Sequence, residues 1–165
     1  MLTVRQAVPG DAMDVAVVHV RSWQVGYRGL VPDEVLNRMR PEDRVARYDF
    51  DPERGDGVLT LVAVDGDAVH GFATIGTSRT EMIGEVWALY VDPDHWRLGV
   101  GRLLIVEARA RLVRRGFDQA ILWVMAGNER AERFYRADGW WPDGGRKRDK
   151  HWGVLVDELR YRRAL

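Results

Sequence analysis

The chain has 165 residues, and its 25 Lys and Arg residues balance 25 Asp and Glu residues, so the formal net charge is zero. Hydrophobic residues make up 46% of the chain, a globular composition that excludes a disordered or collagen-like protein. The absence of cysteine excludes disulfides, thiolate metal sites and a cysteine nucleophile.

The first third of the chain predicts one strand followed by helices. The strand is predicted at 3–7, and apolar residues at helical spacing predict a helix that ends near Trp23. Two glycines then interrupt the pattern and leave an aromatic loop. Short helices are predicted to begin at Pro32 and Pro41.

The middle of the chain predicts three strands in quick succession, at 58–64, 69–77 and 85–91. The Asp-Gly-Asp sequence at 65–67 favours a hairpin turn between the first two strands. Pro93 ends the third strand.

The last third alternates helices with strands. A long helix is predicted at 99–115, a strand at 120–125, a helix at 128–137 and a final strand at 154–162. The inward face of the long helix is expected to hold five apolar residues: Val100, Leu103, Leu104, Ala108 and Leu112. The charged run at 146–150 follows two glycines and is interpreted as a solvated loop.

This order of elements predicts a three-layer α/β (α+β) fold, in which a mixed, mostly antiparallel sheet is flanked by helices on both faces. No repeat or long linker divides the sequence, so a single domain over 1–165 is expected. The longest stretch without a charged residue, 68–78, is too short to span a bilayer, and no apolar signal core begins the chain. We therefore expect a cytoplasmic protein without a membrane partner.

The zero net charge hides an asymmetry. Residues 1–95 hold 9 basic and 16 acidic residues, and residues 96–165 hold 16 basic and 9 acidic ones. Arg supplies 23 of the 25 cations, and its guanidinium suits bidentate binding of phosphate or carboxylate. The pattern favours one anionic ligand over a nucleic-acid partner, although arginine-rich helices that merely solvate a surface would look the same.

The segment 96–102 is a candidate anion site. Gly99 and Gly101 let backbone N–H groups approach a ligand where the long helix begins, and the helix end adds partial positive charge. Arg97 and Arg102 flank the pair. Tight packing of helix on strand would also explain both glycines. A dinucleotide fingerprint would need a third glycine where Leu104 stands.

Two motifs make the chain resemble the GCN5-related N-acetyltransferase (GNAT) family. The segment 96–101, Trp-Arg-Leu-Gly-Val-Gly, is similar to the family's Gln/Arg-x-x-Gly-x-Gly/Ala motif, with Trp96 at its first position. Residues 128–139 are similar to the family's Asn-x-x-Ala-x-x-Phe-Tyr helix. The resemblance covers nearly the whole chain. It implies a GNAT-like acyl-CoA acyltransferase fold and transfer of an acetyl group from acetyl-CoA to the amine of a small molecule or peptide.

The resemblance also implies the cofactor-binding residues and the general acid. Tyr135 would protonate the departing thiolate, and Asn128 lies seven residues earlier on the same helix face. The residues expected to contact acetyl-CoA are Leu89, Tyr90, Val91, Arg97, Leu98, Gly99, Val100, Gly101, Arg102 and Asn128. Alternative interpretations are a core aromatic for Tyr135 and a plain helix cap for Asn128.

Glu85 is the candidate base, because the family often carries a carboxylate on this strand. At strand period Glu85 shares a side with Leu89 and Val91, unless a bulge breaks the alternation. A solvent-facing role for Glu85 is the alternative, and His151 or a chain of water molecules could also take the proton.

Trp23 and Tyr27 are the candidate acceptor-binding residues, in a stretch that resembles the variable substrate loop of small acetyltransferases. Trp140, Trp141 and Trp152 also fall at element ends, where such rings either form a pocket or plug the core. The four histidines show no metal-ligand spacing, so no metal is expected. The resemblance leaves room for a homodimer. A non-catalytic module that binds acyl-CoA is the alternative function.

Overall fold

A computed structural model describes all 165 residues. Seven strands form one sheet: β1 (Leu2–Gln6), β2 (Leu59–Asp65), β3 (Ala68–Thr77), β4 (Gly84–Val91), β5 (Gln119–Met125), β6 (Trp141–His151) and β7 (Val154–Ala164). The α-helices are α1 (Ala12–Gly26), α2 (Asp33–Arg38), α3 (Glu42–Val45), α4 (Val100–Arg114) and α5 (Glu129–Ala137). Short 3-10 helices occupy Pro9–Asp11 and Pro93–His95.

The sheet is mixed but mostly antiparallel. Its strand order is β1-β2-β3-β4-β5-β7-β6, and β4 with β5 is its one parallel pair. A parallel pair requires a crossover connection, which α4 supplies. The predicted α/β (α+β) fold class is confirmed.

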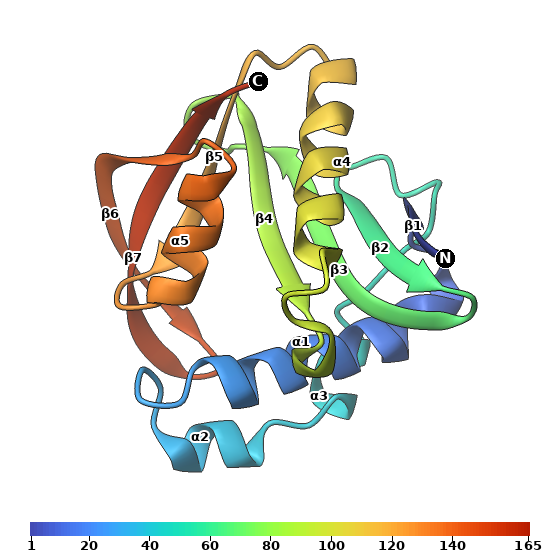
Figure 1. The fold of residues 1–165 in the computed structure, drawn as a ribbon, viewed down its shortest axis with the longest axis vertical. Coiled ribbons are helices and arrows are strands. Elements are labelled where there is room, and N and C mark those ends of the chain that lie inside the picture. The colour runs from blue at the N-terminus through green and yellow to red at the C-terminus, as the bar shows by residue number, and fades with distance from the viewer.

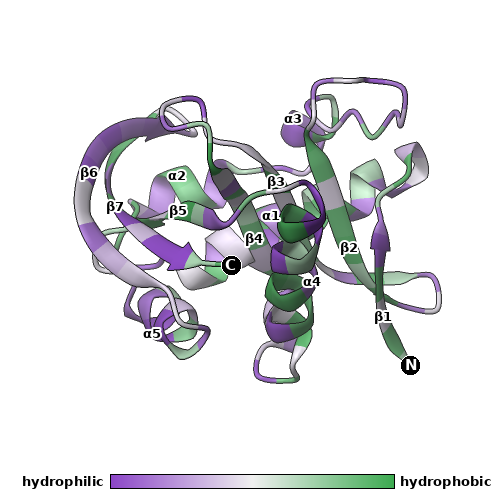
Figure 2. Ribbon diagram, turned by 90° about the horizontal axis from the view of Figure 1, so that it is seen from above, coloured by the Kyte–Doolittle hydropathy of each residue, from purple (hydrophilic) through white to green (hydrophobic).

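Helices cover both faces of the sheet. Along β2, Leu61 and Ala63 pack in the core cluster that contains α4, whereas Val62 and Val64 pack in the cluster that contains α1. Figure 1 shows α4 and α5 together in front of the strands. In Figure 2, β2 is green along most of its length, as a strand buried on both faces should be, while β6 and β7 carry long purple segments.

β4 and β5 separate partway along their length, and this opening positions the site. They pair only over Gly84–Val86 and Ala120–Leu122. β5 continues instead along β7 through Met125, so the second half of β4 has an unpaired edge. Figure 1 shows β4 diverging from β5 and β7 toward the α1 end of the sheet.

A β-bulge at Trp87 decides which side chains of β4 face each helix layer. The pairing with β3 skips Trp87, which is therefore the extra residue. Val86 and Leu89 both pack on the α4 side of the sheet, although strict alternation would place them on opposite faces. The bulge thus breaks the alternation that would have put Glu85 on the same side as Leu89 and Val91.

β6 is the element that the sequence analysis missed. The run 146–150, interpreted as a solvated loop, lies within this strand, which pairs with β7 alone at the edge of the sheet. Pro142 and the two glycines fall in a register shift between Pro142 and Arg146. An edge strand tolerates proline, bulges and many charges, so the strand lacks the apolar alternation on which its prediction depends.

Two side chains differ from their expected burial. Leu103 was expected to face inward, but 42% of it is exposed, and Ile105 is fully buried instead. Trp140 is fully buried in the core cluster on the α4 side, with its indole N–H donating to Asp138 Oδ2 at 2.9 Å. Trp140 is therefore a core residue and does not line a pocket. No helix has both the length and the apolar character that crossing a membrane requires.

Candidate active site

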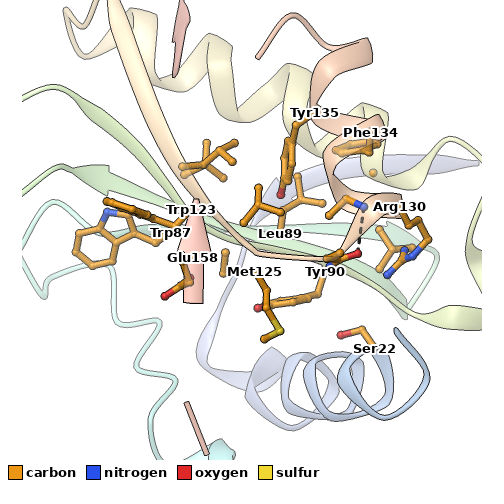
Figure 3. A pocket seen from close by; sticks show the side chains of 18 of the residues that line it. Ser22, Trp87, Leu89, Tyr90, Trp123, Met125, Arg130, Phe134, Tyr135 and Glu158 are labelled. Carbon is orange, nitrogen blue, oxygen red and sulfur yellow. Dashed lines mark hydrogen bonds between the residues drawn. The ribbon is translucent and has the colours of Figure 1, made fainter. Parts of the chain in front are cut away.

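A cavity of about 1120 Å³ occupies the opening between β4 and β5. Its walls come from both strands, the loop before α4, the first turns of α5, the end of α1 and the β6–β7 hairpin. Figure 3 shows Leu89, Tyr90 and Met125 around its centre, with Tyr135 above them and Ser22 of α1 below.

One end of the cavity is a cradle of free backbone donors. The six consecutive amides from Arg97 to Arg102 donate no hydrogen bond to any other group of the protein. They surround the first turn of α4, where the helix dipole is positive. Arg97 and Arg102 line the cavity and form no ion pair. Free amides, a positive helix end and unpaired arginines are together suited to bind an anion such as a diphosphate.

The two glycines of this cradle have different roles. Gly99 has φ +86°, in the left-handed region that other residues rarely adopt, and open space surrounds its Cα. Gly101 has ordinary backbone geometry, but a Cβ there would lie 3.2 Å from the Phe134 ring of α5. The packing interpretation of the Gly-x-Gly pair therefore holds for Gly101, whereas Gly99 provides the backbone conformation of the cradle.

Trp96 braces the cradle at the position where the GNAT motif has Gln or Arg. Its indole N–H donates to the Val91 carbonyl at 2.8 Å. The Arg130 guanidinium of α5 lies 3.7 Å from the centre of the Trp96 ring, a cation–π contact. Arg130 has no carboxylate partner, and partial burial lowers its pKa. The α5 helix thus brings a guanidinium to the place where the motif lacks one.

The unpaired edge of β4 directs backbone groups into the cavity. The Asp92 amide donates to His70 O on β3, so alternate residues of the strand point their N–H and C=O groups toward β3. Leu89 and Val91 therefore point theirs toward the open edge. Val91 O is used by Trp96, and the Leu89 groups face the cavity.

Tyr135 and Asn128 reach the cavity from α5, as the helix-face argument predicted. The Tyr135 hydroxyl has no hydrogen-bond partner in the protein, and Figure 3 shows it pointing toward Leu89. Burial raises its pKa above the ordinary phenol value, so it stays protonated at neutral pH. Asn128 Oδ1 caps the helix by accepting the Ala131 N–H at 3.2 Å, and its amide N–H groups have no protein partner.

Glu85 lines the cavity on the other side of the bulge and makes no hydrogen bond or ion pair with the protein. Burial raises the pKa of its carboxyl above the ordinary value; Lys147 and Arg79 oppose that shift and Glu158 adds to it. A carboxylate that is desolvated and unpartnered is suited to accept a proton.

Glu158 on β7 is a cavity residue that the sequence analysis missed. It is buried, with 9% of its surface exposed, and lies 3.1 Å from His151 Nε2. The sequence could have indicated Glu158 by its place in the inward-facing series Val154, Val156 and Glu158, because a carboxylate is unexpected among buried residues. Asp149 lies close enough to complete a group of three metal-type ligands within 4.8 Å of one another.

The predicted acceptor residues Trp23 and Tyr27 line the α1 end of the cavity, with their ring centres 4.4 Å apart. Of the other predicted site residues, eight of the ten expected to contact acetyl-CoA line the cavity: Leu89, Tyr90, Val91, Arg97, Gly99, Gly101, Arg102 and Asn128. The side chains of the other two point elsewhere, because Leu98 is 66% exposed and Val100 belongs to the core.

Comparison with known proteins agrees with this geometry. Residues 23–140 match the model of the acetyltransferase (GNAT) family. The chain is 33% identical over 132 residues to the uncharacterized N-acetyltransferase YuaI of Bacillus subtilis (strain 168), an alignment that covers 78% of this chain and 74% of YuaI.

Two solved structures share the fold at low sequence identity. PaiA N-acetyltransferase of Thermoplasma acidophilum, in complex with coenzyme A, superposes with a TM-score of 0.78 at 18% identity, covering 100% of this chain and 99% of PaiA. The putative acetyltransferase yncA of Salmonella typhimurium, with its cofactor acetyl-CoA, superposes with a TM-score of 0.73 at 18% identity, covering 99% and 94%.

Proposed function

The chain belongs to the acetyltransferase (GNAT) family, and we propose that it is an N-acetyltransferase that moves the acetyl group of acetyl-CoA to the amine of a small molecule or peptide. The observation that carries the proposal is the run of six free amides at the start of α4, which opens into the same cavity as the Tyr135 hydroxyl. One end binds an anion, and the other holds a proton donor.

The residues present fit acetyl-CoA, which supplies the acetyl group as a thioester. The cradle of free amides, with Arg97 and Arg102, would hold the diphosphate. The unpaired edge of β4 and the Asn128 side chain would bind the pantetheine amides. Two solved structures of the same fold contain coenzyme A or acetyl-CoA.

Three groups of the chain would carry the reaction. The Leu89 N–H, on the open edge of β4, donates to the thioester carbonyl oxygen as negative charge develops on it. Tyr135 gives its hydroxyl proton to the departing sulfur. Glu85 takes the proton from the attacking amine, directly or through water. A single domain over 1–165 would contain every one of these groups.

The test measures free thiol released from acetyl-CoA in the presence of a panel of amines. The wild-type protein should release thiol with at least one amine. Tyr135→Phe should lower kcat on the order of 100-fold, the usual size of a lost general acid, with little change in the KM for acetyl-CoA. Phe keeps the ring and its packing, so the loss would belong to the hydroxyl.

Binding is measured separately by thermal unfolding with and without acetyl-CoA. A concentration of about 100 times Kd should stabilise the fold by about 2.7 kcal/mol. Stabilisation without thiol release from any amine would identify a non-catalytic acyl-CoA-binding module. No stabilisation and no release would reject the proposal.

A further inference from the structure

A second cavity, of about 240 Å³, lies on the α1 side of the sheet. The two cavities share Trp87 and Ala88 of β4. Three arginines line the second cavity: Arg44, Arg47 and Arg54. Aromatic rings, among them Tyr48, form part of the rest of its wall.

Arg44 of α3 is held in an aromatic slot. Its guanidinium carbon lies 5.0 Å from the centre of the Trp152 ring, in the β6–β7 turn, and 6.0 Å from that of Tyr48. The side chain forms no ion pair, and its Nε is buried without an acceptor. A partly buried guanidinium without an anion is costly, and a carboxylate would satisfy it.

Arg44 has no ion-pair partner within the protein. The two carboxylates that line this cavity, Asp49 and Asp51, accept backbone N–H groups of their own turn and form no ion pair. Arg54 is paired with Asp56, which leaves Arg44 and Arg47 as the arginines of this cavity without an ion-pair partner.

The buried His19 beside this cavity responds to the same charge. Its pKa is lowered to about 3, first by burial and then by the charges of Arg44 and His151. The imidazole, which shares a short contact with the Tyr48 hydroxyl, is therefore neutral at physiological pH and leaves the positive field of Arg44 in place.

One layer of rings separates Arg44 from the first cavity. The His19 ring stacks on Tyr90 with centres 4.7 Å apart, and Tyr90 lines the first cavity. On the other side, Trp152 lies 6.4 Å from Trp23 between ring centres. The two cavities adjoin instead at Trp87 and Ala88 of β4, and a molecule of amino-acid size held against these two residues would have its amine in the first cavity and its other end near Arg44.

We propose that the acceptor is a small amine that carries a carboxylate, such as a free amino acid, and that Arg44 binds this carboxylate in the second cavity. The proposal rests on the proposed function and names its substrate class. It argues against a peptide N-terminus, in which the neighbouring carboxyl group is an uncharged amide.

The test compares thiol release with free L-amino acids and with the matching amino-acid amides, in the wild-type protein and in Arg44→Gln. Wild type should prefer the free acids. Arg44→Gln should lower kcat/KM on the order of 100-fold for the acids and little for the amides, because loss of one partner of a buried charge pair acts only on the charged ligand. For each substrate, kcat/KM of Arg44→Gln is divided by kcat/KM of wild type. This ratio cancels the effect of the different basicity of the amino-acid and amide amines.

Arg38→Gln is the matched control, since Arg38 is exposed on α2 and lines neither cavity. It removes an equal charge from the same region and should leave the preference unchanged. Arg44→Lys should keep part of it. Equal loss on acids and amides in Arg44→Gln, or a wild-type preference for amides, would overturn the proposal.

A measurement on the wild-type protein alone covers the case in which Arg44→Gln does not fold. 3-Phenylpropanoate, which has the carboxylate but no amine, should inhibit competitively against the acceptor at concentrations about tenfold lower than 3-phenylpropanamide does. Equal inhibition by both compounds would contradict carboxylate binding. Absence of thiol release with every acid, amide and peptide would instead reject the proposed function itself.

Discussion

Glu85 is the residue whose proposed role has the clearest pH signature. Because burial raises the pKa of its carboxyl, the loss of activity on acidification should begin at a higher pH than for an exposed glutamate. Glu85→Gln should lower kcat/KM on the order of 100-fold and remove that acidic limb, while the limb that belongs to the amine acceptor stays. The pH–rate profile from about pH 4 to about pH 9 would show it.

The stability of Glu85→Gln gives an independent check of the direction of the Glu85 pKa shift. A carboxyl whose pKa is higher in the folded than in the unfolded state favours folding below its unfolded pKa, and this contribution is lost as the pH rises through its folded pKa. Glu85→Gln should therefore unfold at a higher temperature than wild type at neutral pH, with the difference shrinking in acid. Glu158→Gln is the comparison: if it removes the acidic limb and Glu85→Gln does not, Glu158 is the base.

Single residues show what a sequence can and cannot reveal about the site. Tyr135 and Asn128 were predictable because one helix face holds both, and a helix is a local structure. Arg44 was not, because its slot is made by Trp152 in a turn far along the chain. Trp96 stands where the motif has Gln or Arg, and the guanidinium beside its ring belongs to Arg130 of a different helix, which the motif alone does not indicate.

At the scale of elements, the contact of α4 with α5 through Gly101 controls the cradle. A Cβ at Gly101 would lie 3.2 Å from the Phe134 ring, so Gly101→Ala should destabilise the fold by about 1–3 kcal/mol, as overpacking does. Phe134→Leu should relieve part of this cost in the double variant. Urea unfolding of both singles and the double would measure the coupling.

Gly99→Ala is the control for that cycle. Gly99→Ala should destabilise the fold by about 1–2 kcal/mol because Gly99 has a positive φ. An added Cβ would lie in open space, so this loss of stability should be the same with Phe or Leu at position 134. Additive effects in both cycles would contradict the packing role assigned to Gly101.

The prediction of elements succeeded where local pattern decides the structure, and failed where tertiary context does. The hairpin at 65–67 forms with Gly66 at φ +61°, and Gly116 follows α4 at φ +92°. Both turns require glycine-like backbone geometry that the sequence displays. By contrast, β6 exists because β7 offers it an edge, and the Trp87 bulge depends on the pairing with β3. The residues of β6 therefore do not show that it is a strand, and the residues of β4 do not show where its bulge lies.

For the whole molecule, the arginines of the basic C-terminal half fall into two groups. Most of its arginines serve the fold, as in the two-bond pair of Arg109 with Asp138 at 2.9 Å, which ties α4 to the end of α5. Arg160 and Arg162 likewise share Glu81 and Asp143. Arg97 and Arg102 are exposed, unpaired and next to the free amides, so they are suited to attract an anionic ligand.

This division predicts how binding depends on salt. Arg97→Gln and Arg102→Gln should each raise the KM for acetyl-CoA about threefold, the effect of one exposed charge, and leave kcat unchanged. From about 10 mM to about 1 M NaCl the screening length falls from about 30 Å to about 3 Å, so the wild-type KM should rise steeply. It should rise less in the double variant. Arg148→Gln, an exposed charge paired with Asp157 and outside the cavity, should follow the wild-type curve. If wild type, the double variant and Arg148→Gln share one salt dependence, the phosphates bind through backbone amides alone.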